Sequence, residues 1–331
     1  MFSYVYGVLS RFFSAPADLI VTLIVMLLVP LTLVAIIPVI IGWVDRKYGA
    51  RIQSRWGPTY VGPFGILQNV ADVIKLIGKR VITTNVDRLS YSFVPIALTA
   101  ASFLIVVLIP WGAPGLYILD IPYNLLFIYV LMAVSPLLIL LAGWSENNKY
   151  SIIGGFRGAT QIATYELTLI ITILSVAILS GSYNISDIVA SQKHLWYVVY
   201  LPITFLMFVV AGYAVIERDP FDIPEATQEL LAGWKIEYSG LRYGMFLLSD
   251  YIKMFALSML TVYLFFGGWN GPLLPAFAWF WIKTIIAMMI LLTPRWVYPR
   301  LRIDQLVKFG WNWMLPLSIL NLLVVGAVLL V

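Results

Sequence analysis

Residues 196–216 read WYVVYLPITFLMFVVAGYAVI, a run of twenty-one residues without a charged side chain. At 1.5 Å per residue, a helix of this length is about 30 Å long and matches the hydrocarbon core of a bilayer. The next residues, 217–240, read ERDPFDIPEATQELLAGWKIEYSG and hold six of the sixteen carboxylates of the chain. An apolar span followed directly by an acidic loop predicts a membrane protein that gathers its polar groups between spans.

The whole chain supports this fold class. It is 61% hydrophobic and 11% charged, with a mean hydropathy of +0.93, which is typical of polytopic helical membrane proteins. We expect an all-α polytopic membrane protein, with residues 1–331 forming a single integral membrane domain. Eight windows are long and apolar enough to span: about 19–43, 92–110, 124–143, 163–181, 196–216, 245–266, 276–293 and 311–330.

The composition also restricts the chemistry. The chain has no cysteine and one histidine, His194, which excludes iron–sulfur ligation and metal centres built on paired histidines. No metal site is expected, and any redox centre must belong to a partner; His194 is expected on the outer surface. The start, MFSYVYGVLSRFF, lacks the features of a cleaved signal peptide and favours a short amphipathic or re-entrant segment.

Basic residues set the expected orientation. The loops after the odd-numbered spans hold seventeen of the twenty-one Lys and Arg, so the positive-inside rule places these loops in the cytoplasm and both termini outside. Eleven of the sixteen carboxylates are also in these loops, which predicts a partner on that side. The net charge of +5 thus reflects topology and gives no support to nucleic-acid binding. The loops are residues 44–91, 144–162, 217–244 and 294–310.

The first of these loops has two parts. Four basic residues come first, and their simplest reading is contact with lipid headgroups: Arg46, Lys47, Arg51 and Arg55. The segment FGILQNVADVIKLIGKR, residues 64–80, then places apolar residues at helical spacing with Asp72 and Lys75 beside them. This pattern predicts an amphipathic helix on the membrane surface after the first span.

The third loop concentrates the acids. The letters DIPE predict a helix start with Asp222 as N-cap and Glu225 as its capping-box partner, which would put Glu225 and Glu229 on one face. A solvated helix start explains the first two acids equally well. Glu229 and Glu237 lie beyond that turn, and clustered acids with few partners have raised, coupled pKa values that suit proton transfer.

Four ionisable residues fall inside predicted spans. Glu166 has no charged partner near it in sequence, whereas Asp250 and Lys253 are three residues apart and could neutralise each other. Lys283 is equally isolated. Charges at this depth are costly unless paired or hydrated and usually mark an ion or proton route.

Four motifs, one around each polar loop, indicate a resemblance to a known family. They are DRKYGARIQSRWGPTYVGPFGILQNVADVIKL (45–76), GWSENNKYSIIGGFRGATQIATYE (143–166), DPFDIPEATQELLAGWKIEYSG (219–240) and PRWVYPRLRIDQLVKFGWNWMLPLS (294–318). In these motifs, which occur in the family's order, the chain closely resembles the NADH dehydrogenase 1 family, a membrane subunit of respiratory complex I (NADH-quinone oxidoreductase).

The resemblance implies a role for each loop. In that family, the cytoplasmic loops form the membrane side of a quinone cavity beneath hydrophilic subunits that carry the iron–sulfur clusters. Acids run from the cavity toward antiporter-like subunits, small membrane subunits and lipid complete the surroundings, and no covalent catalysis is expected. By position the resemblance implies quinone contacts at Arg46, Arg55 and Phe221; proton coupling at Asp45, Asp72, Glu166, Asp222, Glu225, Glu229, Glu237 and Asp250; and supporting basic residues Arg157, Lys283, Arg295, Arg300 and Arg302.

The chain also departs from the family's pattern. Asp45 and Asp250 stand where glutamate is usual, and Thr227 stands where a further acid is common. Val215 occupies a position that is usually acidic, while Glu217 follows two residues later. These differences indicate an archaeal or otherwise divergent branch and leave the stations of the acid route open.

Alternative functions remain open at this point. The equivalent subunit of a membrane-bound hydrogenase or ferredoxin-linked complex would have similar motifs without binding quinone; bound quinone, or nickel in a partner, would discriminate. A stand-alone ion transporter is disfavoured because no internal repeat is found. A purely structural membrane anchor is also disfavoured, because burying Glu166 in a span costs free energy that such a role would not require. The leading prediction is a quinone-chamber subunit in the plasma membrane that couples quinone reduction to proton translocation.

Overall fold

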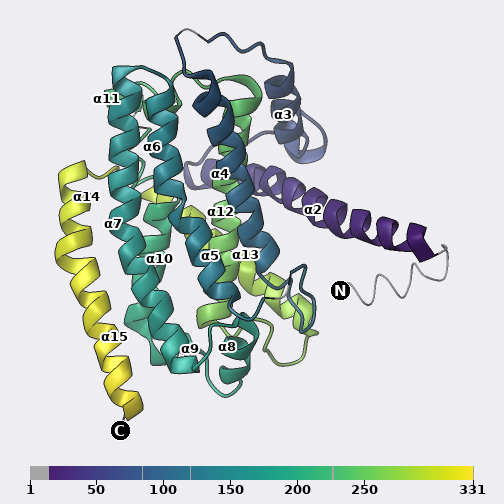
Figure 1. The fold of residues 1–331 in the computed structure, drawn as a ribbon, viewed down its shortest axis with the longest axis vertical. Coiled ribbons are helices and arrows are strands. Elements are labelled where there is room, and N and C mark those ends of the chain that lie inside the picture. The colour runs from purple at the N-terminus through teal and green to yellow at the C-terminus, as the bar shows by residue number, and fades with distance from the viewer. Residues whose placement is uncertain (1–14, 84, 120, 226, 331) are drawn as a thin grey trace.

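The structure, a computed structural model, describes residues 15–83, 85–119, 121–225 and 227–330 (Figure 1). The described residues form helices joined by loops and turns, and no strand occurs among them. The all-helical fold class predicted from hydropathy is therefore confirmed. The segment expected to be amphipathic or re-entrant, residues 1–13, lies outside the described residues.

Ten helical segments build the body of the fold. They are α2 (Ala15–Ile52), α4 (Arg88–Leu108), α5 (Asn124–Ala133), α6 (Ser135–Ser145), α7 (Lys149–Ser180), α10 (Pro202–Val215), α12 (Gly240–Phe265), α13 (Ala276–Val297), α14 (Ile303–Phe309) and α15 (Leu315–Leu330). A π-helical turn, η3 (Gly310–Met314), joins the last two. The remaining elements are η1 (Pro63–Gly65), α3 (Gln68–Gly78), α8 (Ile185–Ser191), α9 (Tyr197–Tyr200), α11 (Thr227–Leu230) and η2 (Gly233–Lys235).

Six described segments are long and apolar enough to cross a membrane: Arg88–Leu108, Asn124–Ser145, Lys149–Ser180, Gly240–Phe265, Ala276–Val297 and Ile303–Leu329. The predicted window 19–43 lies within α2. The window 196–216 is divided into α9 and the 14-residue α10, because the helix is interrupted at Leu201 and begins again at Pro202, which has no N–H to donate. The count of eight spans stays a prediction.

Helix α7 begins well before the predicted span at residue 163. Its first half contains glycines that allow close packing: a Cβ on Gly154 would lie 2.7 Å from the backbone nitrogen of Trp234, and one on Gly155 would lie 3.3 Å from the Cα of Gly143. Close contact with α6 and η2 therefore stabilises the first part of α7, which the polar sequence of residues 144–162 had predicted to be a loop.

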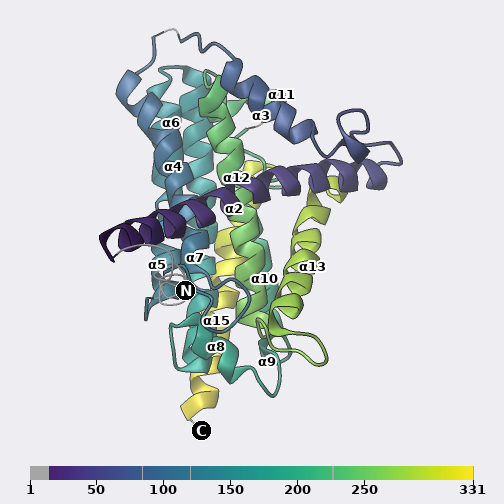
Figure 2. The same cartoon turned by 90° about the vertical axis from the view of Figure 1, so that its right-hand side faces the viewer.

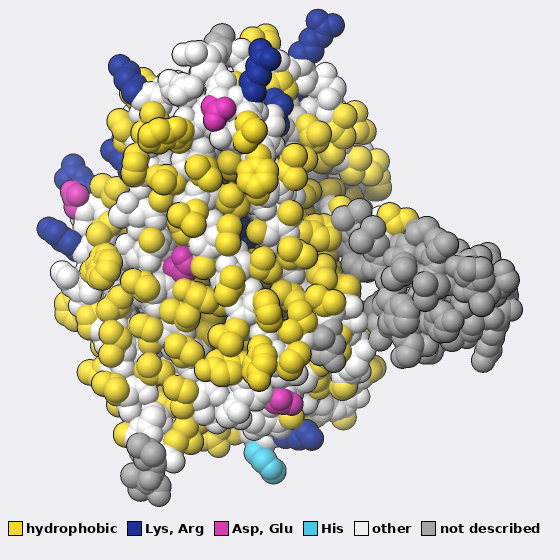
Figure 3. Space-filling view, viewed as in Figure 1, with side chains coloured by type: hydrophobic (Ala, Val, Ile, Leu, Met, Phe, Trp, Pro, Cys, Tyr) yellow, Lys and Arg dark blue, Asp and Glu magenta, His cyan; other side chains and the backbone are white. Residues whose placement is uncertain are grey.

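Helix α12 runs through the middle of the bundle, while α15 lies along one side and α2 crosses the other side obliquely (Figures 1 and 2). Between the ends of the bundle, apolar side chains cover most of the surface, and Lys and Arg gather at the upper end in the view of Figure 3. An apolar band between polar ends is the surface of a multi-pass membrane protein.

The four polar loops come together at one end of the bundle. Figure 1 shows α3 and α11 at this end, with α8 and α9 at the opposite end. Backbone hydrogen bonds connect the loops: Asp87 donates to the carbonyl of Ser145 at 2.8 Å, and Leu301 donates to that of Pro220 at 3.2 Å. Residues that are far apart in sequence therefore build one polar region.

Candidate functional site

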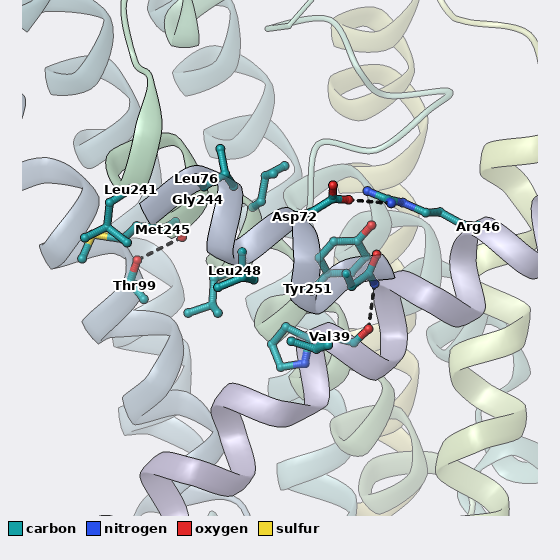
Figure 4. Close-up of a pocket in the computed structure, with 14 residues that line it drawn as sticks. Val39, Arg46, Asp72, Leu76, Thr99, Leu241, Gly244, Met245, Leu248 and Tyr251 are labelled. Atoms are coloured by element: carbon teal, nitrogen blue, oxygen red, sulfur yellow. Dashed lines mark hydrogen bonds and ion pairs between the residues drawn. The ribbon is translucent and has the colours of Figure 1, made fainter. Parts of the chain in front are cut away.

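A cavity of about 310 Å³ lies between α2, α3, α4 and α12 (Figure 4). Its walls are mainly apolar, with Leu241, Met245 and Leu248 from α12 facing Leu76 of α3. One end is polar, since Arg46, Asp72 and Tyr251 lie there. The cavity thus offers an apolar passage that ends at charged and hydroxyl groups.

The amphipathic helix predicted in the first loop is present as α3, and it forms one wall of the cavity. Asn69 holds it against α2, because its side-chain nitrogen donates to the carbonyl of Val39 at 2.7 Å. Val70, Ile74 and Ile77 are exposed on the opposite side of the helix. This exposed apolar face agrees with the predicted position on a membrane surface.

The polar end of the cavity is held by an ion pair. Arg46 Nη1 lies 2.7 Å from Asp72 Oδ2, and Lys75 Nζ lies 3.4 Å from the other oxygen. Partial burial alone would raise the pKa of Asp72, but the hydrogen bonds and charges of Arg46 and Lys75 outweigh it and hold the pKa below its usual value. Asp72 is therefore a carboxylate at neutral pH.

A second cavity of about 360 Å³ adjoins the first. Arg46 lines both cavities, and Arg55, Trp56, Gln68 and Trp296 line the second. The structure thus brings together the two arginines that the family resemblance placed at the quinone entrance.

Phe221 lies elsewhere. It is buried in the core, edge-on to Tyr165 with ring centroids 5.5 Å apart and to Tyr213 at 6.0 Å. Neither described cavity is lined by Phe221. Its expected quinone contact stays a prediction.

Asp45, at 1% exposure, is the centre of a buried charge cluster. Its carboxylate accepts from Arg218 at 3.1 Å, Tyr251 at 3.3 Å and the indole of Trp296 at 3.0 Å, and it forms an ion pair with Arg295. Tyr251 also lines the first cavity, so this cluster connects the cavity wall with α2 and α13.

A second buried cluster is organised by Lys235. Its ammonium forms ion pairs with Glu225 and, at 3.1 Å, with Asp250 Oδ2. Burial alone would lower the pKa of Lys235, but the carboxylates of Asp250 and Glu225 raise it above its usual value. Asp250 therefore forms an ion pair with Lys235 in the loop, and its neutralisation of Lys253 stays a prediction.

The predicted helix start at Asp222 is wrong. Residues 222–225 form a turn, and α11 is a single turn at Thr227–Leu230. The ion pair with Lys235 holds Glu225, while Asp222 is largely buried, and one of its oxygens has no hydrogen-bond partner among the described residues. This burial, reinforced by the nearby carboxylates, raises the pKa of Asp222 to about 7.

The raised pKa expected for Glu229 as one of several clustered acids with few partners is wrong, because this residue has a partner. It is exposed, and its carboxylate accepts a hydrogen bond from Arg157 at 2.7 Å, which lowers its pKa. Arg300 reaches the carbonyl of Ile223 at 3.4 Å, and Arg302 is exposed at the start of α14. These groups belong to the surface of the polar end.

Glu166 lies in α7 and is 8% exposed. Its Oε1 has no hydrogen-bond partner among the described residues, and the charge nearest in effect is that of Lys253 on α12. Glu166 on α7 and Lys253 on α12 thus influence each other electrostatically within the bundle.

Lys283 is not part of the polar end. Its ammonium donates to the carbonyls of Phe266 at 2.7 Å, Gly268 at 3.1 Å and Asn270 at 2.6 Å, where α12 ends. Twelve residues separate it from Arg295 on the same helix, a distance of about 18 Å. The structure makes Lys283 a cap for the end of α12.

Comparison with known proteins identifies the family. A family model described as NADH dehydrogenase matches residues 22–326. The chain belongs to this family. An NADH-quinone oxidoreductase subunit of Syntrophobacter fumaroxidans is 37% identical over 92% of this chain and 95% of its own length. The like-named protein of Geobacter sulfurreducens is 40% identical over 86% and 90%, and that of Carboxydothermus hydrogenoformans is 37% identical over 85% and 82%.

This member of the NADH dehydrogenase family has buried charges that sequence reasoning missed. Besides Lys235, these include Glu146, which is 2% exposed and accepts the backbone N–H of Glu237 at 3.1 Å. Burial raises the pKa of Glu146 to about 8. Glu237 itself is half-buried at this contact. No sequence signal distinguishes Glu146 from a solvated acid, because its burial depends on the packing of α6 against η2.

The described residues contain no group of three or more His, Cys, Asp or Glu that could hold a metal ion. The charged groups that the structure places at the polar end are carboxylates, ammonium and guanidinium groups. These residues can orient a polar ligand and exchange protons with it.

Proposed function

We propose that this chain forms the membrane side of a quinone-reducing chamber in a complex I-type oxidoreductase of the plasma membrane, and that it couples quinone reduction to proton translocation. The observation that carries the proposal is the apolar cavity with the Arg46–Asp72 pair at its end. The relatives named as NADH-quinone oxidoreductase subunits support it.

The cavity suits a quinone in two respects. Its volume of about 310 Å³ lies at the lower end of the range of about 300–1,000 Å³ typical of small-molecule sites, and its apolar walls suit an isoprenoid tail. At the polar end, the guanidinium of Arg46 has N–H groups beyond the one that pairs with Asp72, and these can donate to quinone oxygens, which accept hydrogen bonds.

The redox centre belongs to a partner in this proposal. The chain has no cysteine, so the iron–sulfur cluster that supplies electrons lies in a hydrophilic subunit that covers the polar end. The positive-inside rule places that end in the cytoplasm and both termini outside. Antiporter-like and small membrane subunits, together with lipid, cover the apolar flanks.

Reduction of a quinone to a quinol takes up two electrons and two protons. The added negative charge raises the proton affinity of nearby acids before the protons arrive. Asp45, Asp72 and the Lys235 cluster lie at or beyond the polar end of the cavity, so they can respond to this charge. The coupling is electrostatic and needs no covalent intermediate on this chain.

The cavity can be tested by changing its width. Leu248→Trp narrows the passage and Leu248→Ala widens it, while Leu323→Trp places the same bulk on an exposed site of α15. In the purified complex, we expect Leu248→Trp to raise the KM for a long-tailed quinone at least tenfold, about 1.4 kcal/mol in binding. A short-tailed analogue should be affected less. An unchanged KM for both quinones in an assembled complex would contradict the proposal.

Chemical analysis of the purified complex separates the proposal from its nearest alternative. A co-purifying quinone supports the quinone chamber. Nickel in a partner subunit, together with no quinone reduction, would instead indicate the hydrogenase-type complex.

A further inference from the structure

Glu217 is a buried acid that the family resemblance did not single out. It follows the end of α10 and is 8% exposed. Its Oε1 has no hydrogen-bond partner among the described residues. A carboxyl group in this position cannot be explained as a surface charge or as half of a simple ion pair.

The backbone directs this side chain inward. Glu217 has a φ of 59°, a left-handed conformation that is uncommon for a residue with a Cβ. The carboxyl group lies against α7 at Gly158, where a Cβ would be only 2.8 Å from Oε1. The absence of a side chain at Gly158 therefore makes room for the carboxyl of Glu217.

Glu217 is surrounded by charges of both signs. It lies within the electrostatic reach of Lys235, Lys253, Asp250 and Glu225. Burial raises the pKa of Glu217, even though both lysines act to lower it. Burial therefore favours the protonated form of this carboxyl, while the two ammonium groups favour the carboxylate.

Glu166 lies eight residues further along α7 than Gly158, about 12 Å along the helix. Lys253 is within electrostatic reach of both Glu166 and Glu217. Because Glu217 lies against Gly158, it stands between the Lys235 cluster in the loop and Glu166 further along α7. Glu217 is the acid in the middle.

Arg218 links Glu217 to the cavity. It is the next residue and donates to Asp45, which also accepts from the cavity residue Tyr251. A change in charge at the cavity can therefore reach the turn that positions Glu217 through two hydrogen bonds and one peptide unit.

We propose that Glu217 carries a proton between the loop acids around Lys235 and the membrane-embedded Glu166. Protonated Glu217 releases its proton to water, which delivers it along α7 to the carboxylate of Glu166, and Glu166 becomes a carboxylic acid. Glu217 becomes a carboxylate, which the ammonium groups of Lys235 and Lys253 stabilise. It then takes up a proton that water delivers from the polar end, while Glu225 and Asp250 remain carboxylates paired with Lys235. The inference rests on the proposed function, because it assumes that quinone reduction drives proton translocation.

The first test is Glu217→Gln in the complete complex, since glutamine keeps the shape of the side chain but cannot release a proton. We expect the number of protons translocated per quinone reduced, or the turnover, to fall at least tenfold. The control is Asp304→Asn, at an exposed site of α14, which should match the wild type. Glu217→Gln within twofold of wild type in both quantities would overturn the inference.

A second test moves the carboxyl without removing it. Gly158→Ala places a methyl group against Oε1, whereas at Gly326 no described atom lies within 4 Å of the added Cβ. We expect Gly158→Ala to lower the proton yield severalfold and Gly326→Ala to have no effect. Equal proton yields in the two variants would count against the inference.

A spectroscopic measurement covers the case in which Glu217→Gln fails to assemble. The infrared difference spectrum between oxidised and reduced complex should contain a carbonyl band of a protonated carboxyl group. Glu217→Asp, which keeps the carboxyl, should shift this band, and an unshifted spectrum would overturn the inference. If the wild-type complex reduces no quinone, the proposed function itself is refuted. If the wild-type complex is active and the Glu217 and Gly158 variants match it, only the role of Glu217 is refuted.

Discussion

Replacing Asp45 by asparagine should destabilise the polar end of the fold by about 3 kcal/mol. The substitution removes the one carboxylate that pairs with Arg218 among the described residues and leaves that buried guanidinium without a counter-charge there. Asparagine also has the wrong hydrogen-bonding groups. Donors approach both oxygens of Asp45, from Trp296 on one side and the arginines on the other, so the new amide N–H₂ faces a donor in either orientation.

The magnitude follows from what remains after the change. Removing one partner of a buried ion pair costs about 3–5 kcal/mol. The lower end applies here because Arg295 is 32% exposed and still has Asp219 at 3.9 Å. Arg218 keeps its position over the ring of Tyr251, 4.3 Å from the centroid, a contact worth about 0.5–2 kcal/mol.

The assay is the half-life of the purified complex at a fixed elevated temperature, since large assemblies commonly unfold irreversibly. A loss of about 3 kcal/mol corresponds to a factor of roughly 100, and we expect at least a tenfold shorter half-life. Asp45→Asn with Arg218→Met removes both charges and should recover part of the loss. The exposed Asp304→Asn should change little. A half-life of Asp45→Asn within twofold of wild type would refute the reasoning.

Two further predictions concern other buried charges. Lys283→Met removes three charge-assisted hydrogen bonds at the end of α12 and should shorten the half-life severalfold, while quinone reduction by intact complex stays unchanged, because Lys283 lies far from the cavity. Burial raises the pKa of Glu146 to about 8 and that of Asp222 to about 7, so the folded state keeps protons that the unfolded chain releases. Their contribution to stability is complete below the ordinary carboxyl pKa and is lost as the pH rises from about 5 to 8; half-lives measured across this range should shorten, and Glu146→Gln should flatten the profile.

Hydropathy and helical spacing are sufficient to predict the helical class, most of the long helices and the position of α3. They are insufficient where tertiary packing determines whether a segment is a helix or a turn. The polar start of α7 is helical because Gly154 and Gly155 allow neighbouring backbones to approach closely. The turn at Asp222 replaces a predicted helix because Glu225 is held by Lys235, ten residues further along. Local propensity is a weak prior in both places, since tertiary contacts override it.

In the candidate site, too, some features could be predicted from the sequence and others could not. Motifs placed Arg46, Arg55 and Asp45 in one region, and the structure brings them to the same end of the bundle. The pairing of Asp45 with Arg295 joins residues 250 positions apart, and periodicity contains no information on such a contact. Lys235 went unrecognised because a single lysine in an acidic loop looks like a solvated charge.

The departure at Val215 gains a physical meaning from the fold. Val215 is 2% exposed at the end of α10, in an apolar environment where the burial of an acid would be costly. Two residues later the chain has left the helix, and the left-handed turn at Glu217 directs an acid toward α7. An acid at position 215 would face the apolar core, whereas the acid at position 217 faces the charges around Lys235 and Lys253. A shift of two residues in sequence therefore changes the environment of the acid completely. The next residue, Arg218, faces the opposite cluster at Asp45. Two consecutive residues thus connect the cavity-side cluster with the buried acids, and a variant that alters the turn between them should disturb both.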